Sequence, residues 1–338
     1  MNIAVVGAGL AGLVCARQLQ EQGNQVVVYE KSDEIGGRMS TRQTELGGFD
    51  YGAQYFTASS ENFKKAIVEW RKAGWVSAWE GKLVSLENGV SKPAGRSAER
   101  LKQRYVAVPG MSALGQQLAQ GLDMRTGQLV KRIEAHGDQW LLTMESDSVP
   151  VDADARLFDA VILAVPAVQS ISLLQVAPRL AAQAGQARFA PCWALMLGFQ
   201  DSLDLNYDGA WVQSSRLSWI ARDTSKQQRR PGEHWVAHAS ADWSLEHFDD
   251  DAERAKEKLL RAFHDATGSQ VQPIYATVHK WPFAHATQPI PGECLWDDRQ
   301  RIGACGDWFA AGLEGSGRVE NAYLSGLAMA EALRLAVH

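Results

Sequence analysis

Residues 3–12 read IAVVGAGLAG. The first four are apolar and partly β-branched, which predicts a buried parallel strand. The last six fit the pattern G-x-G-x-x-G, and residues 13–22 then have helical spacing. A second apolar run at 26–29 predicts another strand, which ends at Glu30. One complete βαβ unit therefore fits within about thirty residues.

Each glycine of this unit has a physical role at a nucleotide site. The first permits a tight turn, the second lets the backbone approach a pyrophosphate, and the third lets the helix pack on the strand. Glu30 is placed to accept hydrogen bonds from ribose hydroxyls, and its charge would repel a 2′-phosphate. The unit predicts a dinucleotide site that Gly7, Gly9, Ala11, Gly12 and Glu30 form.

Composition and charge exclude two classes of protein. The 338 residues include 34 Lys and Arg against 39 Asp and Glu, a net charge of −5, whereas nucleic-acid binding needs a clustered basic excess. No window approaches the roughly 18 apolar residues of a membrane span.

The four cysteines are too scattered for a disulfide scaffold or a metal pair, so no metal site is expected. The N-terminus lacks the basic start of a signal peptide, and a cytoplasmic location is expected.

The segment after Glu30 favours FAD over NAD. Residues 31–41 read KSDEIGGRMST, and Arg38 with its glycine pair would add a guanidinium and N–H groups beside the pyrophosphate. Residues 303–307 (GACGD) and 315–322 (GSGRVENA) lie near the other end of the chain. Together these segments resemble the flavin amine oxidase family, in which both ends of the chain hold FAD.

This resemblance implies further cofactor contacts. In the family the C-terminal Asp contacts the ribityl chain or a phosphate, and the helix after it points its positive end at the flavin. Covalent attachment would use a Cys in the loop at 308–318, which has none, so the FAD is expected to be non-covalent. The implied contacts are Lys31, Gly37, Arg38, Gln54, Val130, Asp307, Gly317, Arg318, Val319 and Ala322.

The expected fold is α/β, with a Rossmann-like FAD-binding domain of the amine oxidase type interleaved with a substrate domain of mixed β-sheet and helix. Nine of the twelve Trp residues lie in the substrate domain; most are expected in its core, and two or three in a pocket for a flat ligand. We assign 1–60, 105–165 and 291–338 to the FAD-binding domain, and 61–104 and 166–290 to the substrate-binding domain.

Within the second domain the patterns predict a polar loop at 84–100 and a strand at 210–220. A further strand is expected at 274–281, ending at Trp281-Pro282.

A narrower resemblance concerns the reaction. Residues 50–57 (DYGAQYFT) resemble the D-x-G-A-Q-Y block of renalases, residues 109–114 (PGMSAL) their helix start, and Lys280-Trp281 their K-W pair. Renalases oxidise the 2- and 6-dihydro isomers of NAD(P)H to NAD(P)+, and their FAD passes the electrons to O2, giving H2O2. The resemblance implies a renalase-type oxidase whose partners are a dihydronicotinamide dinucleotide and O2, with no nucleic acid and no membrane.

Five residues are expected at the reacting centre: Gln54, Tyr55, His238, Trp281 and Arg318. Gln54 and Tyr55 would face the flavin, and Trp281 would wall the pocket. His238 would either bind a carboxamide or belong to the core. Arg318 replaces the Tyr with which amine oxidases cage an amine; it would either repel a protonated amine or contact an FAD phosphate.

Several alternatives stay open. Lys280 is either a flavin-side lysine or a solvated strand end, and Asp223 and Thr224 belong either to the pocket or to a polar loop. The alternative function is an amine, polyamine or carotenoid-type flavin oxidoreductase. An amine pocket would be acidic and aromatic-caged, and a carotenoid pocket long and apolar. A non-enzymatic FAD-binding scaffold is the third possibility.

Overall fold

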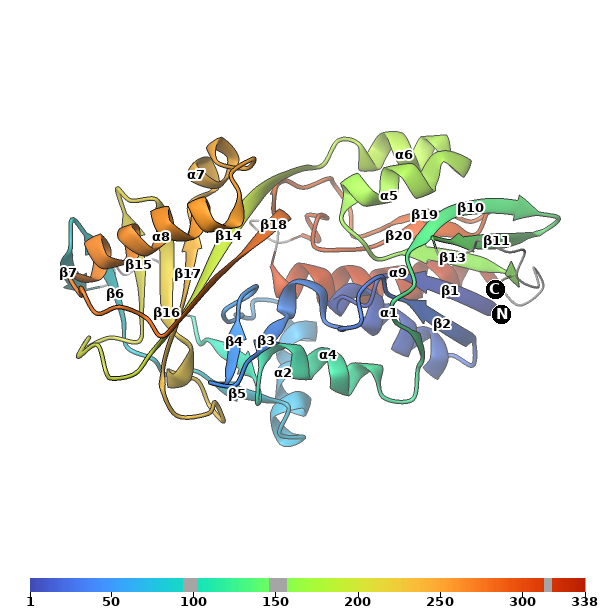
Figure 1. Cartoon of the computed structure of the whole chain (residues 1–338). Helices are drawn as coiled ribbons and strands as arrows, with labels where there is room; N and C mark the ends of the chain where they lie inside the picture. Colours follow the sequence, from blue (N-terminus) through green and yellow to red (C-terminus); the bar gives the residue numbers. More distant parts are fainter. Residues whose placement is uncertain (94–101, 146–156, 313–317, 338) are drawn as a thin grey trace.

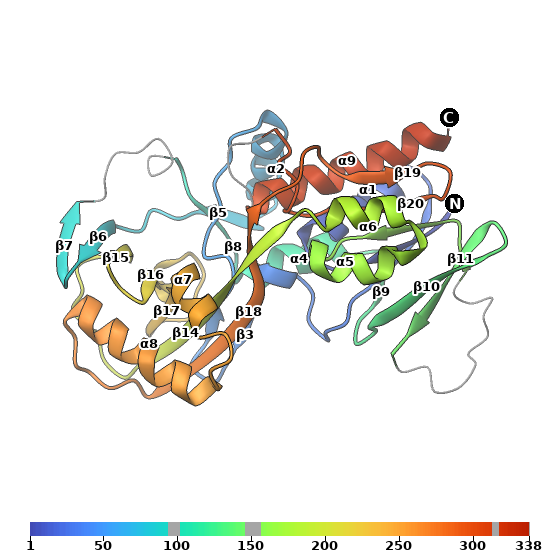
Figure 2. The same cartoon turned by 90° about the horizontal axis from the view of Figure 1, so that it is seen from above.

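The computed structural model describes residues 1–93, 102–145, 157–312 and 318–337. Two lobes lie side by side, and the long strands β14 (Arg188–Phe199) and β18 (Tyr275–Gln288) run from one lobe into the other (Figure 1). Both chain ends lie in the same lobe, and the view from above shows the same division (Figure 2).

The lobe with the chain ends is built on a six-stranded sheet of order β19-β20-β13-β1-β2-β9. Its neighbouring strands are parallel except for the pair β19 and β20. Strand β1 is apolar because helices cover both faces of the sheet. The strands are β1 (Asn2–Val6), β2 (Gln25–Tyr29), β9 (Asp123–Arg125), β13 (Ala160–Leu163), β19 (Leu295–Asp297) and β20 (Ile302–Ala304). A mixed α/β fold with a Rossmann-like domain is thereby confirmed.

Helices from distant parts of the chain cover this sheet. One face packs against α1, α4 and α9, with α2 beside them, and the other face packs against α5 and α6. None of the described helices is long and apolar enough to cross a membrane. Their bounds are α1 (Leu10–Glu21), α2 (Glu61–Lys72), α4 (Met111–Ala119), α5 (Ala167–Leu173), α6 (Pro178–Ala184) and α9 (Val319–Val337).

Three small sheets flank the central one. Two runs at 127–136 and 140–145, joined at Gly137-Asp138, predict a hairpin from the sequence. It is present as β10 (Val130–His136) and β11 (Gln139–Met144), which β12 (Leu157–Phe158) extends. Two antiparallel pairs lie toward the other lobe: β3 (Thr41–Gln43) with β4 (Gly48–Asp50), and β5 (Val76–Ala78) with β8 (Tyr105–Ala107).

The second lobe is a seven-stranded sheet of order β18-β14-β17-β16-β15-β6-β7. Helix α8 (Ala252–Thr267) packs on one face, with α7 (Ala241–Glu246) beside it, and the other face meets the first lobe. Side chains of β17 alternate accordingly, so that Trp235 and Ala237 lie toward α8 while Val236 packs with residues of the first lobe. The remaining strands are β6 (Leu83–Glu87), β7 (Val90–Pro93), β15 (Gly209–Gln213), β16 (Leu217–Arg222) and β17 (Glu233–Ala239).

Three expectations for this lobe are wrong. The predicted loop at 84–100 contains the hairpin of β6 and β7, and the predicted strand at 210–220 is two strands that turn at Ser214, where φ is +52°. Strand β18 continues through Pro282. Among the described strands it pairs with β14 alone, and the register of that pair shifts between Ala190 and Cys192. The missing N–H of the proline therefore breaks no regular ladder.

The strands of the six-stranded and the seven-stranded sheet fall within the segments assigned to the corresponding domain, whereas the pair of β5 and β8 joins a strand of each domain. Helices α2, α5 and α6 do not follow that assignment, because they lie within 61–104 and 166–290 but pack with the six-stranded sheet. Each of these helices has one apolar side, which predicts that this side is buried. It does not indicate which of the two sheets the helix packs against. The domain boundaries themselves stay a prediction.

Candidate active site

The glycine turn after β1 is shaped for close approach by a ligand. Gly7 has a φ of +109°, and a Cβ on Gly12 would lie 2.1 Å from the carbonyl oxygen of Gly7, so neither position tolerates a side chain. A Cβ on Gly9 would meet no atom within 4 Å. Open space therefore lies in front of the N-terminus of α1, where free N–H groups favour an anion.

Glu30 stabilises this turn at the end of β2. Its carboxylate is nearly buried and accepts hydrogen bonds from the backbone N–H of Ala8 at 2.9 Å and of Ser32 at 3.0 Å. With Lys31 and Val130 it lines a pocket of about 320 Å³, which we call the ribose-end pocket. Gly7 lines the pocket too, so the structure brings four of the predicted cofactor contacts together. It also gives Glu30 a bracing role that the pattern did not predict.

An ion pair joins the motifs from the two ends of the chain. Arg38 follows Gly36 and Gly37, whose φ values of +116° and +57° are left-handed. Its guanidinium donates to both carboxylate oxygens of Asp307, at 2.6 and 2.8 Å. Because such a two-bond pair fixes orientation as well as distance, the glycine pair and the segment after β20 are held in one geometry.

A cavity of about 240 Å³, the central cavity, lies between this ion pair and the second lobe. Residues from both ends of the chain and from the seven-stranded sheet line it together. Gly317 lies outside the described residues. The lining residues are Leu10, Gly36, Arg38, Met39, Gly52, Ala53, Cys192, His238, Trp281, Ala284, Asp307, Arg318, Val319 and Ala322.

A second cavity of about 460 Å³, the aromatic chamber, adjoins the central cavity. Five residues line both spaces: Gly52, Ala53, His238, Arg318 and Val319. The two cavities are therefore neighbours along one cleft, and a ligand in one can contact a ligand in the other.

Three aromatic rings wall the chamber. The ring centroid of Trp219 lies 5.6 Å from that of Tyr55 and 5.2 Å from that of Trp211. The guanidinium of Arg104 lies 5.5 Å from the Tyr55 ring and 5.6 Å from the Trp211 ring. Gln54 also lines the chamber, and none of the described lining residues is Asp or Glu.

His238 and Trp219 lie opposite each other on β17 and β16. His238 Nε2 lies 3.2 Å from the carbonyl oxygen of Tyr51; since a carbonyl only accepts, Nε2 carries the proton and Nδ1 is an acceptor. Burial lowers the pKa of His238 to about 4, and the charge of Lys226 adds to this effect. The buried indole N–H of Trp219 has no partner within the described chain. Both residues line the chamber, so a donor without a partner and an acceptor lie in its wall.

Trp281 and Lys280 point to opposite sides of β18. Trp281 lines the central cavity, stacks on Tyr51 at 5.1 Å and donates to the Tyr51 carbonyl oxygen at 3.1 Å. Lys280 Nζ donates to the Phe248 carbonyl oxygen at 2.7 Å and lies 4.4 Å from the centroid of the Phe248 ring. Lys280 is therefore neither a flavin-side lysine nor a solvated strand end, because strand alternation turns it toward the helices.

Three of the nine Trp residues of the predicted substrate domain line these cavities: Trp211, Trp219 and Trp281. Trp235, by contrast, is fully buried in the core under α8. The expectation of two or three pocket indoles is confirmed.

Comparisons with known proteins agree with this geometry. Residues 5–70 match the model of an NAD(P)-binding Rossmann-like domain, and residues 72–334 match that of the flavin containing amine oxidoreductases. The second match covers well over half of the chain. The chain belongs to the flavin-containing amine oxidoreductase family. Its cofactor is FAD.

Curated relatives match this family member over a short segment only. A 4,4'-diapophytoene desaturase of Staphylococcus haemolyticus is 48% identical over 52 residues, which are 15% of this chain and 10% of the relative. The Staphylococcus aureus (strain Newman) enzyme is 35% identical over 77 residues, covering 20% and 15% of the two chains. The matches thus span about a tenth to a seventh of the relatives' length.

Solved structures share the fold over the whole chain. A proposed protoporphyrinogen oxidase from Exiguobacterium has a TM-score of 0.77 at 13% identity, covering 99% of this chain and 98% of the other. A putrescine oxidase variant has a TM-score of 0.71 at 14% identity, with 99% and 98% covered. An oxidoreductase from Methanosarcina mazei has a TM-score of 0.70 at 15% identity, with 98% and 100% covered.

The cleft fits FAD at both ends. The open space at Gly9 and the N-terminus of α1 suit the pyrophosphate, and the ribose-end pocket suits the adenosine. When bound, FAD supplies a two-electron hydride acceptor. Arg318, Val319 and Ala322 bring the first turn of α9 to the central cavity, where the positive end of that helix favours negative charge on the ring.

A buried cluster of charges that no sequence pattern predicted lies behind the chamber. Asp50, Asp223, Lys226 and Arg229 form ion pairs with one another, and Asp223 is fully buried rather than lining the pocket. The Asp of the DYGAQYFT segment was visible in the sequence. The role of Lys226 and Arg229 could not be predicted, because they lie in a polar stretch without periodicity.

Proposed function

We propose that this flavoprotein is a renalase-type oxidase, which takes a hydride from the 2- or 6-dihydro isomers of NAD(P)H and passes the electrons to O2. The supporting observation is the aromatic chamber. Tyr55, Trp211 and Trp219 form walls for a flat ring, and Arg318 is the only charged side chain among the described lining residues. A protonated amine would find no carboxylate in this chamber, and the positive charge of Arg318 would repel it.

The reaction is balanced without a catalytic base. The dihydropyridine loses a hydride, which is two electrons and one proton, and becomes NAD(P)+. The two electrons and two protons, one of them from solvent, then convert O2 to H2O2. The residues therefore need only stack and orient the dihydropyridine and exclude water.

His238 and Trp219 suit the carboxamide of such a substrate. The Nδ1 of His238 would accept from the amide N–H2, and the indole N–H of Trp219 would donate to the amide oxygen. Trp219→Phe keeps the ring and removes only the donor. This variant should bind the dihydro isomers about three- to tenfold more weakly, as expected for one lost hydrogen bond, with little change in the reduction rate at saturation.

Anaerobic mixing tests the proposal. The 2- and 6-dihydro isomers should bleach the flavin absorbance within seconds, and ordinary 4-dihydro NADH and putrescine should be slow. Admission of air should restore the colour and release H2O2. Rapid bleaching by putrescine, with none by the dihydro isomers, would instead establish the alternative of an amine or polyamine oxidase. A cytoplasmic location remains part of the proposal.

A further inference from the structure

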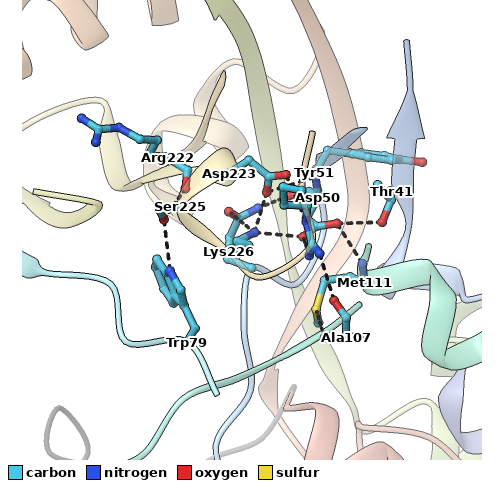
Figure 3. A network of polar contacts seen from close by, with 12 residues as sticks. Thr41, Asp50, Tyr51, Trp79, Ala107, Met111, Arg222, Asp223, Ser225 and Lys226 are labelled. Atoms are coloured by element: carbon cyan, nitrogen blue, oxygen red, sulfur yellow. Dashed lines mark hydrogen bonds and ion pairs between the residues drawn. The ribbon is translucent and has the colours of Figure 1, made fainter. Parts of the chain in front are cut away.

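The buried charges behind the chamber join three segments of the chain. Asp50 ends β4, Asp223 follows β16, and Lys226 and Arg229 lie in the loop before β17. Lys226 Nζ lies 2.6 Å from Asp223 Oδ1 and 3.0 Å from Asp50 Oδ2 (Figure 3). Arg229 Nη2 lies 2.6 Å from the same oxygen of Asp50. Two carboxylates thus face two cations, and none of these four side chains is more than 3% exposed.

Asp50 is the centre of this cluster. Its Oδ1 accepts from Thr41 Oγ1 at 2.7 Å and from the backbone N–H of Met111, at the start of α4, at 2.9 Å (Figure 3). Lys226 and Arg229 hold the pKa of Asp50 well below its usual range despite its burial. Burial and the neighbouring charge of Asp50 raise the pKa of Asp223. Asp50 is therefore firmly ionised, and Lys226 is held beside it.

Gln54 connects the cluster to the chamber. Its Nε2 donates to the backbone carbonyl oxygen of Asp50, and Lys226 Nζ lies 3.4 Å from its Oε1. A carbonyl only accepts and an ammonium only donates, so both contacts require the same orientation of the amide. The second N–H of Gln54 has no acceptor among the described residues, and Gln54 lines the chamber.

We infer that Lys226 is a positioning residue, which holds the Gln54 amide so that an N–H rather than the carbonyl oxygen faces the flavin ring. Without the ammonium, one of the two contacts that fix this orientation is lost, and the share of molecules in which the amide is turned by half a turn and presents its oxygen rises. A donor beside the ring stabilises the negative charge that arrives with the electrons, and an acceptor opposes it. This inference concerns FAD and does not depend on which reductant the enzyme uses.

The test measures the equilibrium constant for two-electron reduction of the bound FAD against a reference dye. Gln54→Leu should lower this constant about three- to tenfold, as expected for one lost hydrogen bond. Lys226→Met combined with Asp223→Asn removes one buried cation and one carboxylate together, so Asp50 keeps Arg229 and no charge is left alone. This double variant should also lower the constant, and adding Gln54→Leu to it should have a smaller effect than in the parent, because both changes act through the same amide.

A matched control separates positioning from a merely structural role. Arg229→Met combined with Asp223→Asn removes an equivalent charge pair but leaves Lys226 on Asp50 and Gln54, so it should destabilise the fold without changing the constant. Equal shifts in both double variants would overturn the inference, as would an unchanged constant in Gln54→Leu. Should the double variants not retain FAD, Gln54→Met keeps all four charges, adds none and removes the donor; a constant equal to that of the parent would then overturn the inference.

Discussion

At the scale of single residues, His238 shows how burial sets the chemistry of the chamber. Its pKa of about 4 means that the ring is neutral above about pH 5, so Nδ1 stays an acceptor throughout the physiological range. Since no other proton transfer is needed for hydride loss, the rate of flavin reduction should be nearly constant from about pH 5.5 to 9.

The same pKa predicts a pH dependence of stability. Between pH 6.5 and 4 the unfolded chain binds a proton at His238 and the folded chain does not, so the free energy of unfolding falls as the pH falls through this window. His238→Gln keeps a donor for the Tyr51 carbonyl but cannot titrate. Urea unfolding of this variant should show a pH slope smaller by about 1.4 kcal/mol per pH unit. The same substitution at exposed His136 is the control, and an equal effect there would contradict the assignment.

Glu30 carries a prediction on cofactor affinity. Its carboxylate braces the N–H groups of Ala8 and Ser32 and faces the ribose-end pocket. Glu30→Ala should therefore weaken FAD binding by about 1–3 kcal/mol, measured by titrating the apoprotein with FAD, and should leave the reduction rate of the saturated enzyme unchanged. Exposed Glu34, in the same loop, is the matched control. An unchanged affinity would reduce Glu30 to a structural brace.

Site residues that belong to a motif of fixed spacing could be predicted from the sequence, and site residues outside such a motif could not. Gly7, Gly12 and Glu30 are placed by a short βαβ unit, in which sequence distance nearly equals spatial neighbourhood. Lys226 and Asp50 are 176 residues apart in the chain and 3.0 Å apart in space. Their pairing depends on how the seven-stranded sheet meets the first lobe, and no local pattern encodes that.

At the scale of elements, the crossing of α1 and α9 holds the two ends of the chain together. A Cβ on Gly326 would lie 2.4 Å from the carbonyl oxygen of Ala11, so the helices touch backbone to backbone. Gly326→Ala must push the helices apart and should lower the free energy of unfolding by about 1–3 kcal/mol. At Gly185, where φ is −63° and the nearest atom to a new Cβ lies at 3.4 Å, the same change should be neutral or slightly stabilising. Equal losses at both sites in urea titrations would contradict this account.

Helices and hairpins with a strong local pattern could be predicted, because the residues that form them are close together in the sequence. The helix that begins at Met111 and the hairpin at Gly137-Asp138 are present as expected. The hairpin of β6 and β7 was missed because β7 is exposed throughout and has no apolar alternation. The other partner of β6 is β15, more than a hundred residues later in the chain, so no local pattern indicates this pairing.

At the scale of the whole molecule, residues near both ends of the chain line the cleft that suits FAD, and we expect the cofactor to be held without a covalent bond. The one cysteine among the described residues that line the central cavity is Cys192. Burial raises the pKa of its thiol to about 12, so the nucleophilic thiolate is scarcely populated at neutral pH. The loop predicted to lack an attachment cysteine lies partly outside the described residues, but residues 308–318 contain none in the sequence.

Acid precipitation of the purified protein should therefore release all of the yellow colour into the supernatant. The same result is expected for Cys192→Ser, since a serine fits the site and forms no flavin thioether. Bound FAD should also raise the unfolding free energy, by about 2.7 kcal/mol at a free concentration of one hundred times its Kd, because ligand that binds only the folded chain shifts the equilibrium by mass action. Colour that stays with the precipitated parent but leaves the Cys192→Ser variant would reveal a covalent bond at this cysteine. Colour that stays with both would place a bond elsewhere, and either result would contradict a non-covalent cofactor.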